Sequence, residues 1–196
     1  TYRFTSKGGH THFTLNYGVR MSHWSFNKET IVSPRVSLGI IPAYSENTTF
    51  RFAAGLYYQA PFFKELRDTS TVNGITYANL NEKIKSPRSI HFIAGYDYRF
   101  RINNLRYRFS AEAYYKALGN FIPYSVNNVK VVYYGENRAS GHATGIDLKL
   151  YGEVVPGADS WLTFSLMNTS MKLNGKSVPL PTDQRFAVNL FFTDYF

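Results

Sequence analysis

The chain has 196 residues, no cysteine and a formal net charge of +9. The lack of cysteine excludes a disulfide framework, a zinc–thiolate site and a catalytic thiol, and no stretch reaches the roughly 18 consecutive apolar residues of a membrane-spanning helix. The positive charge is compatible with nucleic acid, an anionic ligand or anionic lipid headgroups as partners. Because the sequence opens at Thr1 without a signal segment and its last residues still alternate like a strand, we expect a piece of a longer protein.

Runs of alternating apolar and polar side chains recur along the chain, a period of two that is typical of a β-strand with two different faces. In one such run, Leu105, Tyr107 and Phe109 alternate with Arg106 and Arg108. The pattern predicts eight strands, over residues 11–26, 34–41, 49–59, 88–100, 104–118, 141–153, 161–172 and 184–196.

The predicted connections differ in length. Short turns follow the second, fourth and sixth strands, whereas long connections over residues 60–86 and 119–140 follow the third and fifth. The link after the first strand, residues 27–33, fits neither class, and a short helical turn is predicted at 62–66. Short turns on one side and long loops on the other are typical of bacterial outer-membrane barrels.

Three features favour a transmembrane β-barrel over a soluble β-sandwich. The predicted strands run about ten residues or more, against a usual five or six. Charges of both signs occur at mid-strand on the polar face, and a membrane strand must pair every backbone group, which closure into a barrel achieves. Aromatic side chains are expected near strand ends on the apolar face, as in interfacial girdles: Trp24, Phe26, Tyr58, Tyr96, Tyr98 and Tyr115. We therefore expect an all-β, antiparallel transmembrane β-barrel.

Six short segments, in order along nearly the whole chain, resemble the β-barrel of a TonB-dependent outer-membrane receptor of the Bacteroidetes type. They are Ser33–Leu38, Ala54–Pro61, Glu112–Lys116, Ala143–Asp147, Gly152–Trp161 and Pro181–Arg185. The resemblance implies a barrel of about 22 strands with a plugged lumen, of which residues 1–196 would form a part, with about eight strands. It also implies that the plug and the N-terminal parts lie outside this sequence.

The resemblance further implies that a ligand is captured outside the cell and that an energised inner-membrane complex then displaces the plug. It implies no bond change and no cofactor. The implied partners are outer-membrane lipid, the TonB complex, a nutrient ligand of unknown class and a surface lipoprotein. Two alternatives stay open: a small eight-stranded outer-membrane barrel with a structural or adhesive role, and a soluble β-sandwich binding module.

The polar face, taken as the lumen, carries an excess of basic residues. They could attract an anionic substrate or contact the plug, but a ladder of cross-strand ion pairs is the favoured interpretation. Glu112, between Arg108 and Lys116, and Asp147, beside basic neighbours, are the simplest candidates for such pairs. The predicted luminal charges are Arg20, Arg35, Arg51, Arg99, Arg106, Arg108, Glu112, Lys116, Asp147, Lys149 and Arg185, with Asp97 and Glu153 on the same face.

Ligand contacts are expected from the long loops and the upper lumen. Aromatic and amide side chains there suit a sugar, a peptide or a siderophore about equally well, and the same residues could instead pack the loops against each other. The candidates are Tyr57, Gln59, Phe62, Phe63, Lys64, Arg67, Tyr124, Asn127, Asn128, Tyr133 and Asn137.

Other chemistries have little support in the sequence. His10 and His12 could share a strand face as metal ligands, but no carboxylate lies close by to complete a site, so no metal site is predicted. A nucleic-acid interface expects basic and aromatic residues on one shared surface. Here the two types alternate onto opposite faces, so we expect no nucleic-acid partner.

Overall fold

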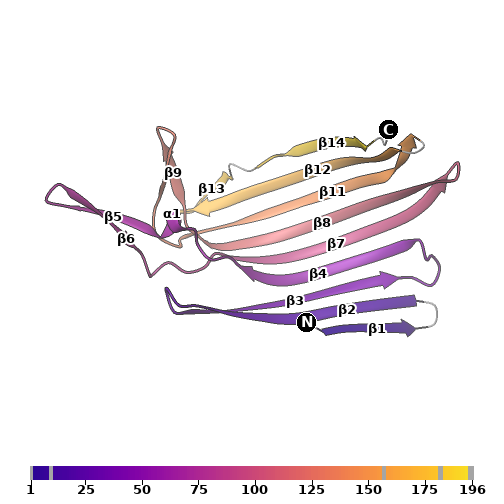
Figure 1. Cartoon of the computed structure of the whole chain (residues 1–196), viewed down its shortest axis with the longest axis horizontal. Coiled ribbons are helices and arrows are strands. Elements are labelled where there is room, and N and C mark those ends of the chain that lie inside the picture. Colours follow the sequence, from indigo (N-terminus) through magenta and orange to yellow (C-terminus); the bar gives the residue numbers. More distant parts are fainter. Residues whose placement is uncertain (1, 9–10, 156–157, 181–182, 194–196) are drawn as a thin grey trace.

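The computed structural model describes residues 2–8, 11–155, 158–180 and 183–193. Ten strands form one antiparallel sheet in chain order, except that β13 and β14 both pair with β12 (Figure 1). They are β1 (Tyr2–Gly8), β2 (Thr11–Trp24), β3 (Glu29–Ile41), β4 (Thr48–Tyr58), β7 (Arg88–Ile102), β8 (Leu105–Phe121), β11 (Ala139–Val155), β12 (Ala158–Leu173), β13 (Lys176–Pro179) and β14 (Phe186–Thr193). Each of the eight predicted strands is present, with bounds that differ by a few residues, and the last three residues of the eighth, 194–196, lie outside the described residues. The sequence pattern missed β1 and β13.

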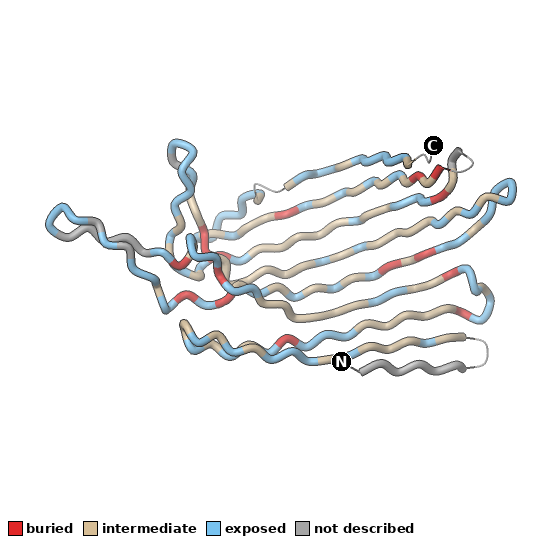
Figure 2. The backbone as a smooth tube through the Cα atoms, in the orientation of Figure 1, coloured by how far each residue is buried: buried red, intermediate tan, exposed pale blue. Residues whose placement is uncertain are grey.

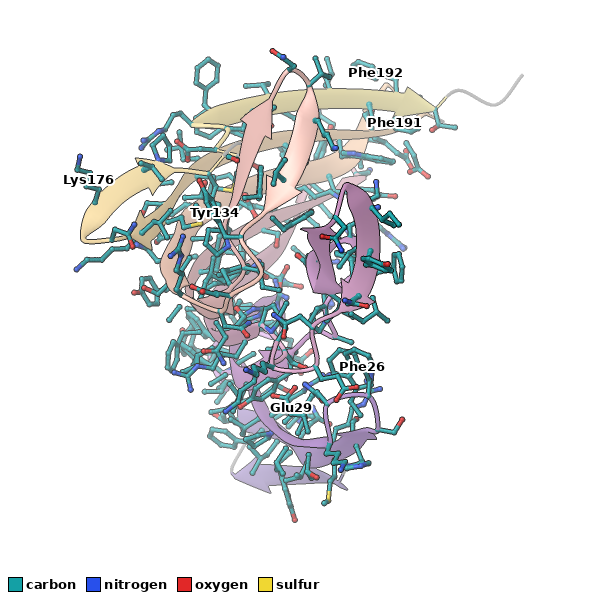
Figure 3. The ribbon with its side chains drawn as sticks, turned by 90° about the vertical axis from the view of Figure 1, so that its left-hand side faces the viewer. Phe26, Glu29, Tyr134, Lys176, Phe191 and Phe192 are labelled. Atoms are coloured by element: carbon teal, nitrogen blue, oxygen red, sulfur yellow. The ribbon has the colours of Figure 1, made fainter. Side chains whose placement is uncertain are left out.

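Alternate residues point to opposite faces of this sheet, and each face stays in register from strand to strand. On the apolar face, one row crosses β3, β4, β7, β8, β11 and β12. We call it the middle row: Leu38, Phe52, Ala94, Ala113, Ile146 and Leu166. Figure 3 looks at the curved sheet from the loop end, and it shows Phe191 and Phe192 on opposite sides of β14. The predicted separation into a polar and an apolar face is therefore confirmed.

The expected position of two aromatic residues is wrong. Trp24 has the same parity as Arg20 and lies directly across from Glu29, on the polar face. Its ring contacts that of Phe26, with centroids 5.3 Å apart, and both residues pack against buried side chains of the loops. Trp24 and Phe26 therefore brace the loops and do not belong to a lipid-facing girdle.

The long connections gather at one end of the sheet and the short turns at the other (Figure 1). The turn between β2 and β3, which the sequence left unclassified, is short but lies at the long-loop end. The predicted helical turn is present, and each long connection also contains a hairpin that was not predicted. The elements of these connections are α1 (Phe63–Leu66), β5 (Arg67–Val72), β6 (Ile75–Leu80), β9 (Tyr124–Asn127) and β10 (Lys130–Tyr133).

The sheet is a single open layer. Within the described ranges no pairing joins β1 to β14, so the strands do not close into a small barrel, and no second sheet covers either face to make a sandwich (Figure 1). The main cluster of buried hydrophobic residues lies where the loops meet the sheet (Figure 2). In the part of the chain that the structure describes, no helix has the length and apolar character to cross a membrane.

The apolar face is broad and exposed. Phe52, Phe92 and Leu166 in its centre are 45%, 53% and 45% exposed, and their neighbours on the same face are also hydrophobic. A soluble monomer rarely exposes a contiguous apolar patch of more than a few hundred Å². The outer wall of a transmembrane barrel, in contrast, requires such a face toward lipid.

The boundary of the apolar face runs obliquely across the strands. From the middle row toward the loop end, apolar residues continue to Val32 on β3 and to Ile90 on β7, whereas on β12 Leu166 is already the last and Asn168 follows. Between β3 and β12, which lie about 24 Å apart across the sheet, the boundary thus shifts by about 20 Å in the direction of the strands. A lipid boundary parallel to the membrane then implies a strand tilt of roughly 40°, which is within the range of transmembrane barrels.

This orientation predicts opposite effects of a charge on the two faces. Ala111 lies in the middle of the apolar face of β8, whereas Ser165 on the polar face lies across from Asp147. Near the bilayer midplane, Ala111→Arg should lower the free energy of unfolding of the full-length protein by about 2–4 kcal/mol. Ser165→Arg, the control, should have little effect. Denaturant unfolding in lipid vesicles measures both, and equal losses would contradict the assignment of the faces.

Candidate functional site on the polar face and its loops

An ion-pair network occupies the middle of the polar face. The Asp97 carboxylate on β7 accepts hydrogen bonds from Arg51 Nε on β4 at 2.6 Å and from Arg108 Nη2 on β8 at 2.8 Å. Its side chain is only 7% exposed, and a more distant contact of 3.6 Å joins Arg51 to Glu112. One nearly buried carboxylate therefore ties three neighbouring strands together through two guanidinium groups.

A glycine makes room for this network. Gly95 lies between Arg51 and Glu112 in the register of the sheet. A Cβ atom at Gly95 would lie 3.1 Å from Arg51 Nη2, which is closer than nearly all real contacts of this kind. The bare backbone therefore lets the Arg51 side chain lie flat and reach across β7.

The acidic partners differ from those expected. Glu112 contacts Arg51, and not the Arg108 or Lys116 of its own strand. Asp147 lies directly across from Glu112, and no ion pair of Asp147 occurs within 4 Å among the residues that the structure covers. Like charges directly opposite each other are destabilising, so this carboxylate pair depends on the basic residues around it.

The other predicted luminal charges form two further zones. Arg35 and Lys116 lie on the polar face nearer the loops. At the short-turn end, Arg99 is directly across from Arg108. The polar face also carries Arg20, Arg106 and Lys149. Arg185 lies just before β14 and forms an ion pair with Asp183 at 2.8 Å. The polar face therefore alternates from basic to mixed to basic along its length.

The two long connections form a platform at the end of the sheet. Its core consists of Leu66, Ile84 and Ile122, which are 6%, 1% and 5% exposed. Trp24 and Phe26 pack against this core from the turn between β2 and β3, and Tyr133 packs against it from the second connection. The platform thus joins three separate segments of the chain by hydrophobic contact.

Asparagine side chains fix the platform further. The Asn137 side chain accepts a hydrogen bond from the Lys85 N–H at 2.7 Å and donates to the carbonyl oxygens of Lys85 and Asn120 at 2.8 and 2.7 Å. Asn27 donates to the Ile84 carbonyl oxygen at 2.8 Å. Both connections are therefore held to each other and to the sheet by amide hydrogen bonds that mimic backbone pairing.

Glu29 anchors the first connection at its end. Its Oε2 atom accepts hydrogen bonds from the Ser86 N–H at 2.9 Å and the Ser86 hydroxyl at 2.7 Å, and from Asn27 at 3.2 Å. Burial favours a higher pKa for Glu29, but these hydrogen bonds and the nearby Lys85 charge outweigh it and hold the pKa below its usual value. The ionised carboxylate is therefore the form that docks the loop. Glu29 lies at the loop end of the sheet (Figure 3).

The structure does not gather the predicted ligand residues into one pocket. Tyr57 lies on the polar face, the Gln59 N–H donates to the Pro87 carbonyl oxygen, and Asn137 is part of the platform. The others lie along the exposed first connection or on the β9–β10 hairpin: Phe62, Phe63, Lys64 and Arg67 on the first, and Tyr124, Asn128 and Tyr133 on the second. The side chain of Asn127 lies outside the described structure.

A pocket of about 590 Å³ lies between the two long connections. Most of its lining residues have polar side chains, and of these only Asn137 was predicted from the sequence. Asn81, Lys83 and Lys85 were missed, because they lie in an irregular segment whose side-chain directions depend on how the connections pack. The lining also includes Asn120, Tyr134 and Glu136.

A single-layer antiparallel sheet with one lipid-type face, one charged face and loops docked at one end defines the wall of a transmembrane β-barrel. A family model described as TonB dependent receptor-like, beta-barrel matches residues 1–196. The chain therefore belongs to this family, whose members are outer-membrane receptors and transporters and not enzymes. A search of curated proteins found no match to the chain.

The contacts of Asp97 predict how much this residue contributes to the free energy of unfolding. Asp97→Ala would remove two charge-assisted hydrogen bonds and leave Arg51 and Arg108 without the carboxylate that they share, so the free energy of unfolding should fall by about 3 kcal/mol. Glu112→Ala removes only a 3.6 Å contact of a side chain that is 33% exposed, and should cost less than about 1 kcal/mol. Denaturant unfolding of the full-length receptor tests the difference, and equal losses would contradict it.

The position of Glu29 predicts a pH effect on the loop. Because its folded pKa is depressed, the docking free energy is fully present above the unfolded pKa and is lost as the pH falls through the folded pKa. Amide exchange at Ser86, corrected for its intrinsic rate, should therefore accelerate on acidification. Glu29→Ala should weaken docking by about 1–3 kcal/mol at neutral pH and abolish this pH dependence. Glu82→Ala, in the same connection, is the control and should leave both unchanged.

Proposed function

We propose that this chain is part of the barrel wall of a bacterial outer-membrane receptor that captures a nutrient ligand and imports it across the outer membrane. The observation that carries the proposal is the division of one sheet into a lipid-type face and a charged face, with the loops docked at one end. Together with the family, this division supports an outer-membrane location with lipid on one side and a polar lumen on the other.

The rest of the transport cycle follows from the family and is proposed for the whole protein. Active import requires a plug in the lumen and a segment that the TonB complex engages, and we propose both in other parts of the receptor. We also propose that the receptor is of the Bacteroidetes type and works with a surface lipoprotein. The chain itself contributes wall, luminal charge and loops, and no catalytic step.

The loop platform is the proposed outer part of the ligand path. Asn137 is central to this role, because its side chain joins the first connection, at Lys85, to the end of β8, at Asn120. The pocket between the connections offers amide, ammonium and phenol groups. Such groups bind hydroxyl and carboxylate groups of a nutrient through hydrogen bonds.

A growth experiment tests the proposed import. The gene that encodes the receptor is deleted, and growth is compared when the limiting nutrient is supplied as a ferric siderophore, an oligosaccharide or a peptide. We expect a defect for one class, which the wild-type gene restores. Asn137→Ala should restore uptake several-fold less well at equal amounts of folded barrel, because it releases the platform. Glu82→Ala, at an exposed residue of the first connection outside the lining of the pocket, should restore it fully. Normal growth of the deletion strain on all three would contradict the proposal.

A further inference from the structure

A group of basic and aromatic side chains lies on the polar face between the ion-pair network and the loops. We call it the upper cluster, and it consists of Arg35, Tyr57, Ser89, His91 and Lys116. The register places Arg35 and His91 on either side of Gly55, Lys116 across from His91, and Ser89 across from Tyr57. Four neighbouring strands, β3, β4, β7 and β8, therefore contribute to one small area of the wall.

The rings of the upper cluster are stacked. The Arg35 guanidinium carbon lies 4.4 Å from the centroid of the Tyr57 ring, and the His91 ring lies 4.3 Å from the same ring. A Cβ atom at Gly55 would approach Tyr57 Cε2 to 2.9 Å and Arg35 Cγ to 3.2 Å. The glycine therefore allows the stack to rest against the backbone, and the positions of these side chains are set by the sheet itself.

Among the described residues, the two cationic side chains of the upper cluster contact aromatic rings and have no carboxylate partner. Neither Arg35 nor Lys116 has a carboxylate within 4 Å in the described structure, and Lys116 contacts only the ring of Tyr114, at 5.0 Å, among the ring contacts. The Ser89 hydroxyl oxygen is buried and has no hydrogen-bond partner among the described residues. Arg35 and Lys116 thus place two positive charges in this area that no carboxylate of the described wall balances, so an anionic group is the partner that the area lacks.

The middle of the wall differs from the upper cluster in its charge balance. There, two arginines share the carboxylate of Asp97, so their charges are balanced within the chain. In the upper cluster the two cationic groups come from separate strands, and Arg35 lies over the Tyr57 ring and not beside a carboxylate. Arg and Lys side chains form their strongest hydrogen bonds with carboxylate and phosphate groups.

We propose that the upper cluster binds an anionic group, a carboxylate or a phosphate, of the ligand that the receptor imports. Lys116 and Arg35 supply the charge, and the Tyr57–His91 stack offers a ring face to the body of the ligand. The inference rests on the proposed function in one respect, namely that ligands reach the wall from the loop end.

Isothermal titration calorimetry on the full-length receptor in detergent tests the site with citrate, inorganic phosphate and, as a neutral control, glycerol. We expect at least one anion to bind, with an affinity that falls as ionic strength rises, and glycerol not to bind. Lys116→Gln and Arg35→Gln should each weaken binding about tenfold, the equivalent of one charge-assisted hydrogen bond. Arg99→Gln removes a luminal arginine at the short-turn end and should change the affinity less than about twofold. Altered migration of the unheated protein in electrophoresis identifies any variant that has not folded.

Two results would overturn the proposal. An equal loss in the Arg99→Gln variant would mean that the anion responds only to the overall charge of the lumen. No binding of either anion to the native receptor would mean that the cluster is already occupied, as it would be by an acidic segment of polypeptide inside the barrel. Both results leave the growth experiment unaffected, so a failure of this site can be distinguished from a failure of the proposed import.

Discussion

A strand that crosses lipid has to pair every backbone N–H and C=O group with a neighbouring strand, because no water is available to replace a missing partner. From β2 to β12 each strand has a neighbour on both sides. The ladder between β3 and β4 is the shortest of these, because it joins only Arg35–Ile40 of β3 to β4. Along the paired parts of the strands the register is constant apart from shifts at the two ends of β11, and a constant register places alternate side chains on shared faces. The backbone ladder thus defines two separate faces of the sheet, and the side chains make one face apolar and the other polar.

The alternation of side chains was sufficient to predict the long strands and their two faces, because the position of a residue in a strand determines the face to which its side chain points. It could not predict partners across the sheet. Glu112 contacts Arg51, a residue of a different strand two positions away in the sheet, and nothing in the spacing within one strand indicates this. Trp24 was misplaced for a related reason, since its aromatic character suggested a girdle while its parity already assigned it to the polar face.

The loops were harder to predict than the wall. The strands of the β5–β6 and β9–β10 hairpins span only six and four residues each, too few for a clear period, although Asn73 and Gly74 carried the turn signal with positive φ at both positions. The predicted site residue Asn137 proved to hold the platform together. The lysines of the pocket beside it, Lys83 and Lys85, could not be predicted, because their segment is irregular and its direction is fixed by Glu29 and Asn27 from elsewhere in the chain.

The glycines of the polar face have an effect on the space inside the barrel. At Gly55 and Gly95 the long side chains of Arg35, Tyr57 and Arg51 lie over bare backbone, where a larger residue would force them outward. Long charged groups placed this way coat the wall and do not narrow the passage. A barrel can thus carry arginines at high density and still leave clearance for a bulky solute. A larger residue at either glycine position would push these side chains into the passage and reduce that clearance.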